Sequence, residues 1–321
     1  MLGFRRKRLR ARRLAALAIE PDGVAFAQVL RADSGPPVLE ACEHHDVTSA
    51  AQWSAVIEDL SRRHHLDSVR CSVLLGSDAY SLLLVESPEV PAEELRAAVR
   101  WRVRDLIDFH VDDAAMDVFD VPPLRGAGRA PMVYVAAARA AMVAERVALA
   151  ERADLALEVI DIEELALRNL AAELAEDAVG VAMLHLSGET GHITLTREST
   201  LYLARRLDGL SAAMPVLADD TPSVEHPRVR EWLDVLMVEV QRSLDYYESS
   251  FSQAPITHLV IGPMSRPVEG MARYFADQLG LTVRAIDLAA VLECSAAPPP
   301  SVQARCFSAV GAALRHEEVS L

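Results

Sequence analysis

A pattern of secondary structure that occurs twice does most to limit how this chain of 321 residues can fold. In each half, a meander of short apolar runs is followed by a segment with helical periodicity and then by one more apolar run. These three parts lie at 14–42, 53–63 and 69–75 in the first half, and at 179–207, 229–251 and 258–261 in the second. A further amphipathic helix, expected at 162–170, joins the halves. The repeat of element order predicts an internally duplicated α/β protein.

The charges of the chain are unevenly distributed. Seven of the 32 basic residues lie in the acid-free segment Arg5–Arg13, so that 25 basic residues face 47 acidic residues in the remainder. An acidic body binds nucleic acid poorly, and we expect no nucleic-acid partner. The basic tail either contacts anionic lipid, at roughly 1 kcal/mol per residue near the surface, or only solubilises the chain. No apolar run approaches the ~20 residues of a membrane-spanning helix, and no secretory signal is recognised.

The sequence contains residue types that can bind a metal or catalyse hydrolysis, but their spacing fits neither a metal site nor a catalytic motif. His44-His45 and His64-His65 are sequential pairs, whose rings point apart on a regular element. No GxSxG motif occurs, which argues against a serine hydrolase. We therefore expect neither a metal site nor catalytic residues. The cysteines show no CxxC spacing and are interpreted as reduced core thiols of a cytosolic protein: Cys42, Cys71, Cys294 and Cys306.

The pattern changes from residue 79 onwards and predicts a small inserted subdomain. Strands are expected at 81–86, 115–121, 132–138 and 157–160, with helices from Ala92 to Phe109 and from Met142 to Arg152. The first of these helices carries an apolar face and, on another face, an arginine stripe that is a candidate surface for an acidic peptide. The apolar face consists of Val99, Val103, Leu106 and Ile107; the stripe consists of Arg96, Arg100 and Arg104, and Trp101 belongs to neither. The acidic residues that follow are interpreted as a solvated surface: Asp105, Asp108, Asp112 and Asp113.

Four segments of the chain resemble the MshI/PilM family. They are RWRVRDLIDFHVDDAAMDVFDVPP (100–123), PMVYVAAARAAMVAERVALAERADLALEVIDIEELALRNL (131–170), VEVQRSLDYYESSF (238–251) and VGAALR (310–315). These are actin-like proteins of the type IV pilus assembly platform, and MshI is the form from mannose-sensitive haemagglutinin (MSHA) pili. The resemblance covers nearly the whole chain from Leu14 and implies a duplicated actin-like, ribonuclease H-like α/β fold with an inserted α+β subdomain.

The resemblance also implies a division into domains, a partner and a location. A basic tail (1–13) precedes a first domain (14–178) with the insert at about 79–150, and the last helix of the second domain (179–321), at about 305–316, returns to the first. The family is cytoplasmic and peripheral to the inner membrane, where the tail Arg5–Arg13 is an additional membrane contact. It binds the short cytoplasmic N-terminal peptide of a single-span, PilN-like protein in a groove between first-domain core and insert. Candidate partner-binding residues here are Arg96, Arg100, Trp101 and Arg104.

Actin-like ATPases hold Mg·ATP between their halves, with glycine turns at the phosphates and carboxylates that order Mg²⁺. The corresponding turns here depart from the family pattern. Pro21 removes an N–H donor from the turn Glu20-Pro21-Asp22-Gly23, whose glycine also comes late. His185 stands where the second turn would have an aspartate, and Gly262-Pro263 replaces a glycine pair. The candidate residues of this degenerate cleft are Glu20, Asp22, Gly23, His185, Ser187, Gly188, Glu239 and Gly262.

These features together favour an actin-fold adaptor without efficient ATP hydrolysis. Glu20, Asp22 and Glu189 remain able to serve a metal in shifted positions, so ATP and Mg²⁺ stay open as ligands. The only lysine is Lys7, in the tail, so the lysine that some PilM-like proteins carry in the first phosphate hairpin is absent. The alternatives are a slow or nucleotide-gated ATPase that powers or regulates pilus assembly, and a cytoskeletal polymer.

Overall fold

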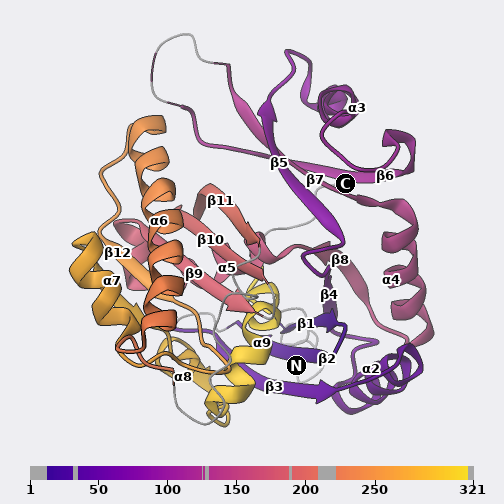
Figure 1. Cartoon of the computed structure of the whole chain (residues 1–321). Coiled ribbons are helices and arrows are strands. Elements are labelled where there is room, and N and C mark those ends of the chain that lie inside the picture. The colour runs from indigo at the N-terminus through magenta and orange to yellow at the C-terminus, as the bar shows by residue number, and fades with distance from the viewer. Residues whose placement is uncertain are drawn as a thin grey trace.

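The first half of the chain supplies five strands of a six-stranded mixed sheet (Figure 1). Its meander consists of β1 (Arg13–Glu20), β2 (Gly23–Leu30) and β3 (Val38–Asp46), which pair antiparallel. β4 (Arg70–Leu74), β8 (Leu157–Asp161) and the short β14 (Glu293–Cys294) complete the strand order β14-β3-β2-β1-β4-β8. The computed structural model describes residues 13–31, 35–124, 126, 130–187, 190–208 and 222–316.

Helices cover both faces of this sheet, which explains why β1 is a continuous apolar run rather than an alternating one. On one face, α2 (Ala50–His64) and α4 (Ala140–Arg152) enclose a core that includes Leu17. On the opposite face, α5 (Glu163–Ala171) and α9 (Pro300–Ala313) pack on a second core that includes Ala16.

The second half repeats this arrangement, and the predicted duplication is confirmed. β9 (Val181–Ser187), β10 (Thr190–Arg197) and β11 (Thr200–Asp208) form an antiparallel meander. β12 (His258–Ile261) and β13 (Thr282–Ala285) add in parallel, in the strand order β11-β10-β9-β12-β13. The sheet packs against α6 (Pro227–Ser250) and α7 (Met271–Leu279), and η2 (Ala175–Ala178) and α8 (Leu288–Val291) are short connections. Among the helices of the described ranges, none combines the length and the apolar character needed to cross a membrane.

The insert forms a third, antiparallel sheet of β5 (Tyr80–Glu86), β7 (Met132–Arg139) and β6 (Ala114–Asp120), in that order. The helix α3 (Ala92–Val103) covers one of its faces, and η1 (Val111–Asp113) precedes β6. The other face rests on the second half, where the Tyr134 hydroxyl accepts a hydrogen bond from the Ala204 backbone N–H at 3.0 Å. The insert therefore contacts both halves of the molecule (Figure 1).

Two expectations about the insert are wrong. The helix α3 ends at Val103 rather than at Phe109, and Leu106 is 57% exposed instead of part of the apolar face. The acidic residues from Asp105 onwards oppose the negative end of the helix dipole, which favours an early end. The strand grouped with the insert, β8, pairs in parallel with β4 of the first sheet. Apolar periodicity identifies a strand but does not say which sheet it joins.

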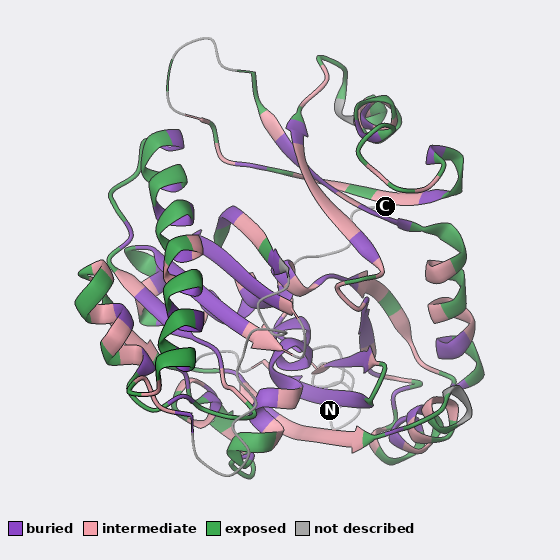
Figure 2. Cartoon of the chain, viewed as in Figure 1, coloured by how far each residue is buried: buried purple, intermediate pink, exposed green. Residues whose placement is uncertain are grey.

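The two halves share one core, which α5 and α9 fill. The buried cluster around Phe307 of α9 includes residues of the first sheet and also Val181, Met183 and Val260 of the second. α9 approaches α5 so closely that a Cβ added to Gly311 would lie 2.3 Å from the backbone oxygen of Ala166. Figure 2 shows the buried sheets and the exposed outer sides of the peripheral helices, such as α6.

Candidate functional site

In the first candidate turn, between β1 and β2, the acidic side chains form ion pairs with an arginine of α9. The Arg305 guanidinium lies 2.8 Å from the Asp22 carboxylate and 3.8 Å from that of Glu20, and its Nε donates to Nε2 of His44 at 3.0 Å. Burial raises the pKa of Glu20, and the positive charge of Arg305 opposes that rise. Gly23 faces His44, because a Cβ there would lie 2.3 Å from Nε2 of that ring.

His185 of β9 fills the space between the second and third candidate turns. Its side chain is 1% exposed, its ring lies 4.8 Å from that of Phe307, and its Nδ1 has no hydrogen-bond partner. A Cβ added to Gly262 would lie 2.7 Å from this Nδ1, so the third turn packs directly on the imidazole. Burial lowers the pKa of His185 to about 3, and the ring is therefore neutral.

The remaining candidates of the cleft are dispersed. The backbone oxygen of Ser187 accepts from the Thr190 hydroxyl at 3.2 Å, within its own hairpin. Gly188 lies outside the described residues. Glu239 of α6 accepts from Arg205 at 2.7 Å and from Arg242 at 2.5 Å, both within the second half. Among the described contacts, nothing joins Glu239 to the turns around Arg305 or His185.

The sequence interpretation missed the residues that complete this region. Glu163, at the start of α5, accepts a 2.5 Å hydrogen bond from Ser308 and lies 3.5 Å from Nε2 of His185. Glu164 accepts from the Tyr80 hydroxyl at 2.6 Å. Burial raises the pKa of Glu163 to about 8 and also raises that of Glu164. Two adjacent acids in a first helical turn are usually exposed and stabilised by the helix dipole. Nothing in the local sequence shows that Glu163 and Glu164 are buried instead.

This arrangement does not fit Mg·ATP. Glu20 and Asp22, two of the acids that would order the metal, are paired with Arg305, and Pro21 supplies no N–H group to a phosphate. The third acid, Glu189, lies outside the described residues. His185, a neutral and buried imidazole, stands where the resemblance predicts the second carboxylate, and it packs on the glycine of the third turn. The described part of the cleft is thus filled by the protein's own side chains.

The arginine stripe of α3 is engaged within the insert. Arg96 contacts Asp117 at 2.9 Å and Arg104 contacts Asp105 at 3.2 Å. Arg100 donates to the backbone oxygen atoms of Val111 and Ala114 and so holds the chain that follows the helix. Trp101, in contrast, is 73% exposed.

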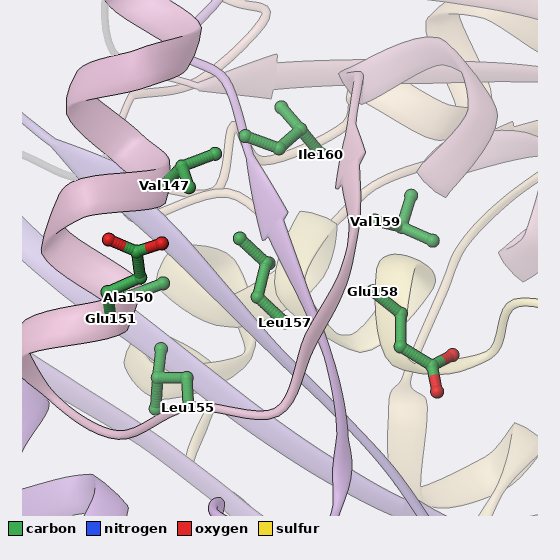
Figure 3. A pocket seen from close by; sticks show the side chains of 8 residues that line it. All are labelled: Val147, Ala150, Glu151, Leu155, Leu157, Glu158, Val159 and Ile160. Carbon is green, nitrogen blue, oxygen red and sulfur yellow. The ribbon is translucent and has the colours of Figure 1, made fainter.

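A groove of about 330 Å³ runs between α4 and β8 (Figure 3). β8 is the last strand of the first sheet, and no strand among the described residues pairs with its outer edge. A β-bulge at Glu158 changes the alternation, so that Leu157 and Ile160 both extend toward α4. The residues that line the groove are Val147, Ala150, Glu151, Leu155, Leu157, Glu158, Val159 and Ile160.

Two lobes of the same element order, closed around a shared core, define a protein of the actin-like fold. A model of the family described as type IV pilus assembly protein PilM matches residues 40–208, more than half of the chain. The chain therefore belongs to the PilM family.

Comparison with solved structures agrees with this fold. The chain is similar to a structure described as a PilM-PilN type IV pilus biogenesis complex, with a TM-score of 0.69, 21% identity, and coverage of 95% of this chain and 97% of that one. It is less similar to the cytoplasmic domain of EpsL, an inner membrane component of the type II secretion system of Vibrio cholerae (TM-score 0.48, 10% identity, 92% and 94% covered). A protein of actin-like ATPase fold and unknown function from Bacteroides thetaiotaomicron gives a TM-score of 0.46 at 9% identity, with 95% and 98% covered. No curated protein matches the sequence.

Proposed function

We propose that this protein is an actin-fold adaptor of the type IV pilus inner-membrane platform. It binds the cytoplasmic N-terminal peptide of a single-span, PilN-like protein and does not hydrolyse ATP efficiently. Membership of the PilM family and the similarity to a PilM-PilN complex support such a partner. A peripheral position at the inner membrane follows from the partner, with the tail Arg5–Arg13 as a further contact. Assignment to the MSHA type of pilus rests on the sequence resemblance alone.

The open edge of β8 carries this proposal. An extended peptide can add to a free strand edge through main-chain hydrogen bonds, while pockets beside the strand select its side chains. Here the groove beside the edge is apolar, because Leu157, Ile160 and Val147 face it (Figure 3). Glu151 lies at its rim and favours a peptide that carries a basic residue, whereas Glu158 already accepts a hydrogen bond from Arg70 at 2.5 Å. The groove also lies where α4 leads from the insert back to the first sheet.

The exposed side of α3 is the second proposed contact. Trp101 presents a large apolar ring to solvent, and aromatic side chains are frequent anchors in interfaces. Arg96, Arg100 and Arg104 already have partners inside the insert, so a bound acidic peptide must compete with these contacts.

A peptide titration tests the groove. The probe is a synthetic peptide of the cytoplasmic N-terminal residues of the PilN-like protein, titrated into the full-length protein by calorimetry. Val147→Arg places a long charged side chain in the groove, and we expect at least a tenfold loss of affinity, or about 1.4 kcal/mol. The control variant Ala144→Arg introduces the same side chain three residues earlier, at an exposed position of α4, and should bind the peptide with normal affinity.

The result separates the two contacts. Trp101→Ala should weaken binding less than Val147→Arg, because it removes a contact without blocking the strand edge. Arg100→Glu is a poor test, since Arg100 also holds the backbone after α3. Normal affinity in Val147→Arg would refute binding in the groove.

A further inference from the structure

Three of the four cysteines gather where the C-terminal segment returns to the first sheet. Cys42 lies on β3, Cys294 on β14 and Cys306 on α9. Cys294 is paired with Leu39 of β3 in the sheet. The β2–β3 ladder has a bulge at Glu40, which changes the alternation of β3. Leu39 and Cys42 therefore both face the core that contains α9.

The side chains of Cys42 and Cys306 are neighbours in this core. Sγ of Cys306 lies 3.1 Å from the backbone oxygen of Glu43, the residue after Cys42, and each thiol shifts the pKa of the other. α9 packs on β3 at this point. A disulfide requires two cysteines on closely packed segments, and α9 and β3 bring Cys306 and Cys42 to the same core.

The two thiols differ in accessibility and in acidity. Cys42 is partly accessible, whereas Cys306 is buried. Interaction with the Cys306 side chain lowers the pKa of Cys42, while interaction with Cys42 and burial raise the pKa of Cys306. The accessible thiol is thus the better nucleophile. A metal site does not explain the cluster, because no group of three or more His, Cys, Asp or Glu residues in the described ranges could hold an ion.

We propose that Cys42 and Cys306 form a reversible oxidation site for hydrogen peroxide. The Cys42 thiolate attacks one peroxide oxygen, the O–O bond breaks, and the leaving hydroxide takes a proton, giving a sulfenic acid and water. The Cys306 thiol then loses its proton and attacks the Cys42 sulfur. An S–S bond forms and the S–O bond breaks, releasing a second water. Two thiols and one peroxide thus give one disulfide and two waters.

The bond would fix α9 on the first sheet. Phe307, the residue after Cys306, packs on His185 of the second half, so the linked helix is the one that contacts both halves. The disulfide closes a loop of more than 260 residues, and long loops gain most from a cross-link.

Peptide mapping of the peroxide-treated, full-length protein tests the proposal. After the free thiols are alkylated, trypsin cuts behind Arg305, so that Cys294 and Cys306 fall in different peptides. We expect the Cys42 peptide to be linked to CFSAVGAALR, the link to disappear with dithiothreitol, and the thermal midpoint to rise by several degrees on oxidation. Cys42 linked to Cys294 instead, or both Cys42 and Cys306 recovered alkylated, would overturn the proposal.

Single substitutions then assign the roles. Cys42→Ser and Cys306→Ala should each abolish the link and the thermal shift, whereas Cys294→Ser, the matched control, should keep both. In Cys306→Ala, dimedone should label Cys42, because the sulfenic acid has no partner to attack it. A thermal shift that persists in Cys42→Ser would contradict the assignment. If a variant does not fold, the peptide map of the peroxide-treated wild-type protein still shows whether Cys42 and Cys306 become linked.

Discussion

Single buried side chains give this protein an unusual dependence on pH. The Glu163 carboxyl has a pKa of about 8 in the folded state, raised chiefly by burial, against about 4.3 in an unfolded chain. The folded state therefore binds this proton more tightly than the unfolded state does. The resulting stability is fully present below pH ~4 and is lost as the pH rises through about 8.

The variant Glu163→Gln should remove this dependence. Glutamine keeps an oxygen that can accept from Ser308 but has no proton to lose. We expect the variant to be close to the wild type near pH 5 and to gain about 4 kcal/mol of unfolding free energy over it between pH 5 and pH 9. Urea unfolding at both pH values measures the difference, with the exposed Glu145→Gln as the control. Equal slopes of stability against pH in wild type and variant would show that Glu163 is ionised when folded.

Single elements could be predicted from sequence far better than the contacts between them. The meanders and the helices α2, α5 and α6 follow their apolar periodicity closely, whereas α9 begins at Pro300 rather than near residue 305, because proline is tolerated in a first helical turn. The sheet that β8 joins could not be predicted, because the apolar pattern of this strand is compatible with the first sheet and with that of the insert. The cleft depends on pairs far apart in the chain, such as Ser308 with Glu163 and Arg305 with His44. Nothing local marks these pairs, so residue type and spacing identified the turns but not what fills them.

The crossing of α5 and α9 gives a test at the level of two helices. In an exposed helix, Gly→Ala stabilises by about 1 kcal/mol. At Gly311 the new Cβ would lie 2.3 Å from the Ala166 backbone oxygen, so the helices must separate. We expect Gly311→Ala to lower the free energy of unfolding by about 1–3 kcal/mol, as overpacked cores do. Denaturant unfolding provides the measurement, and Ser301→Ala, exposed on the same helix, should change little. A more stable Gly311→Ala would mean that the helices are further apart.

The molecule as a whole is held closed by contacts that do not involve a nucleotide. α9 joins the two sheets in one core, and the insert contacts β11 through Tyr134. Arg206 of β11 also donates to the backbone oxygen of Ser77, beside the first sheet. Side chains of α5, α9 and β9 meet where the two halves touch, so among the described residues the folded chain itself makes the contacts between them.

This closure predicts that Mg·ATP leaves the stability of the protein unchanged. A ligand at about 100 times its Kd would stabilise the folded state by about 2.7 kcal/mol. For a chain of this size, that corresponds to a rise in the thermal midpoint of roughly 4 °C. We expect no shift at millimolar Mg·ATP, and no heat in a calorimetric titration, because Arg305 holds Glu20 and Asp22 while His185 packs on Gly262. A nucleotide-binding actin-fold ATPase in the same buffer is the positive control. Saturable heat with one site per chain would mean that the halves open and that the protein responds to nucleotide.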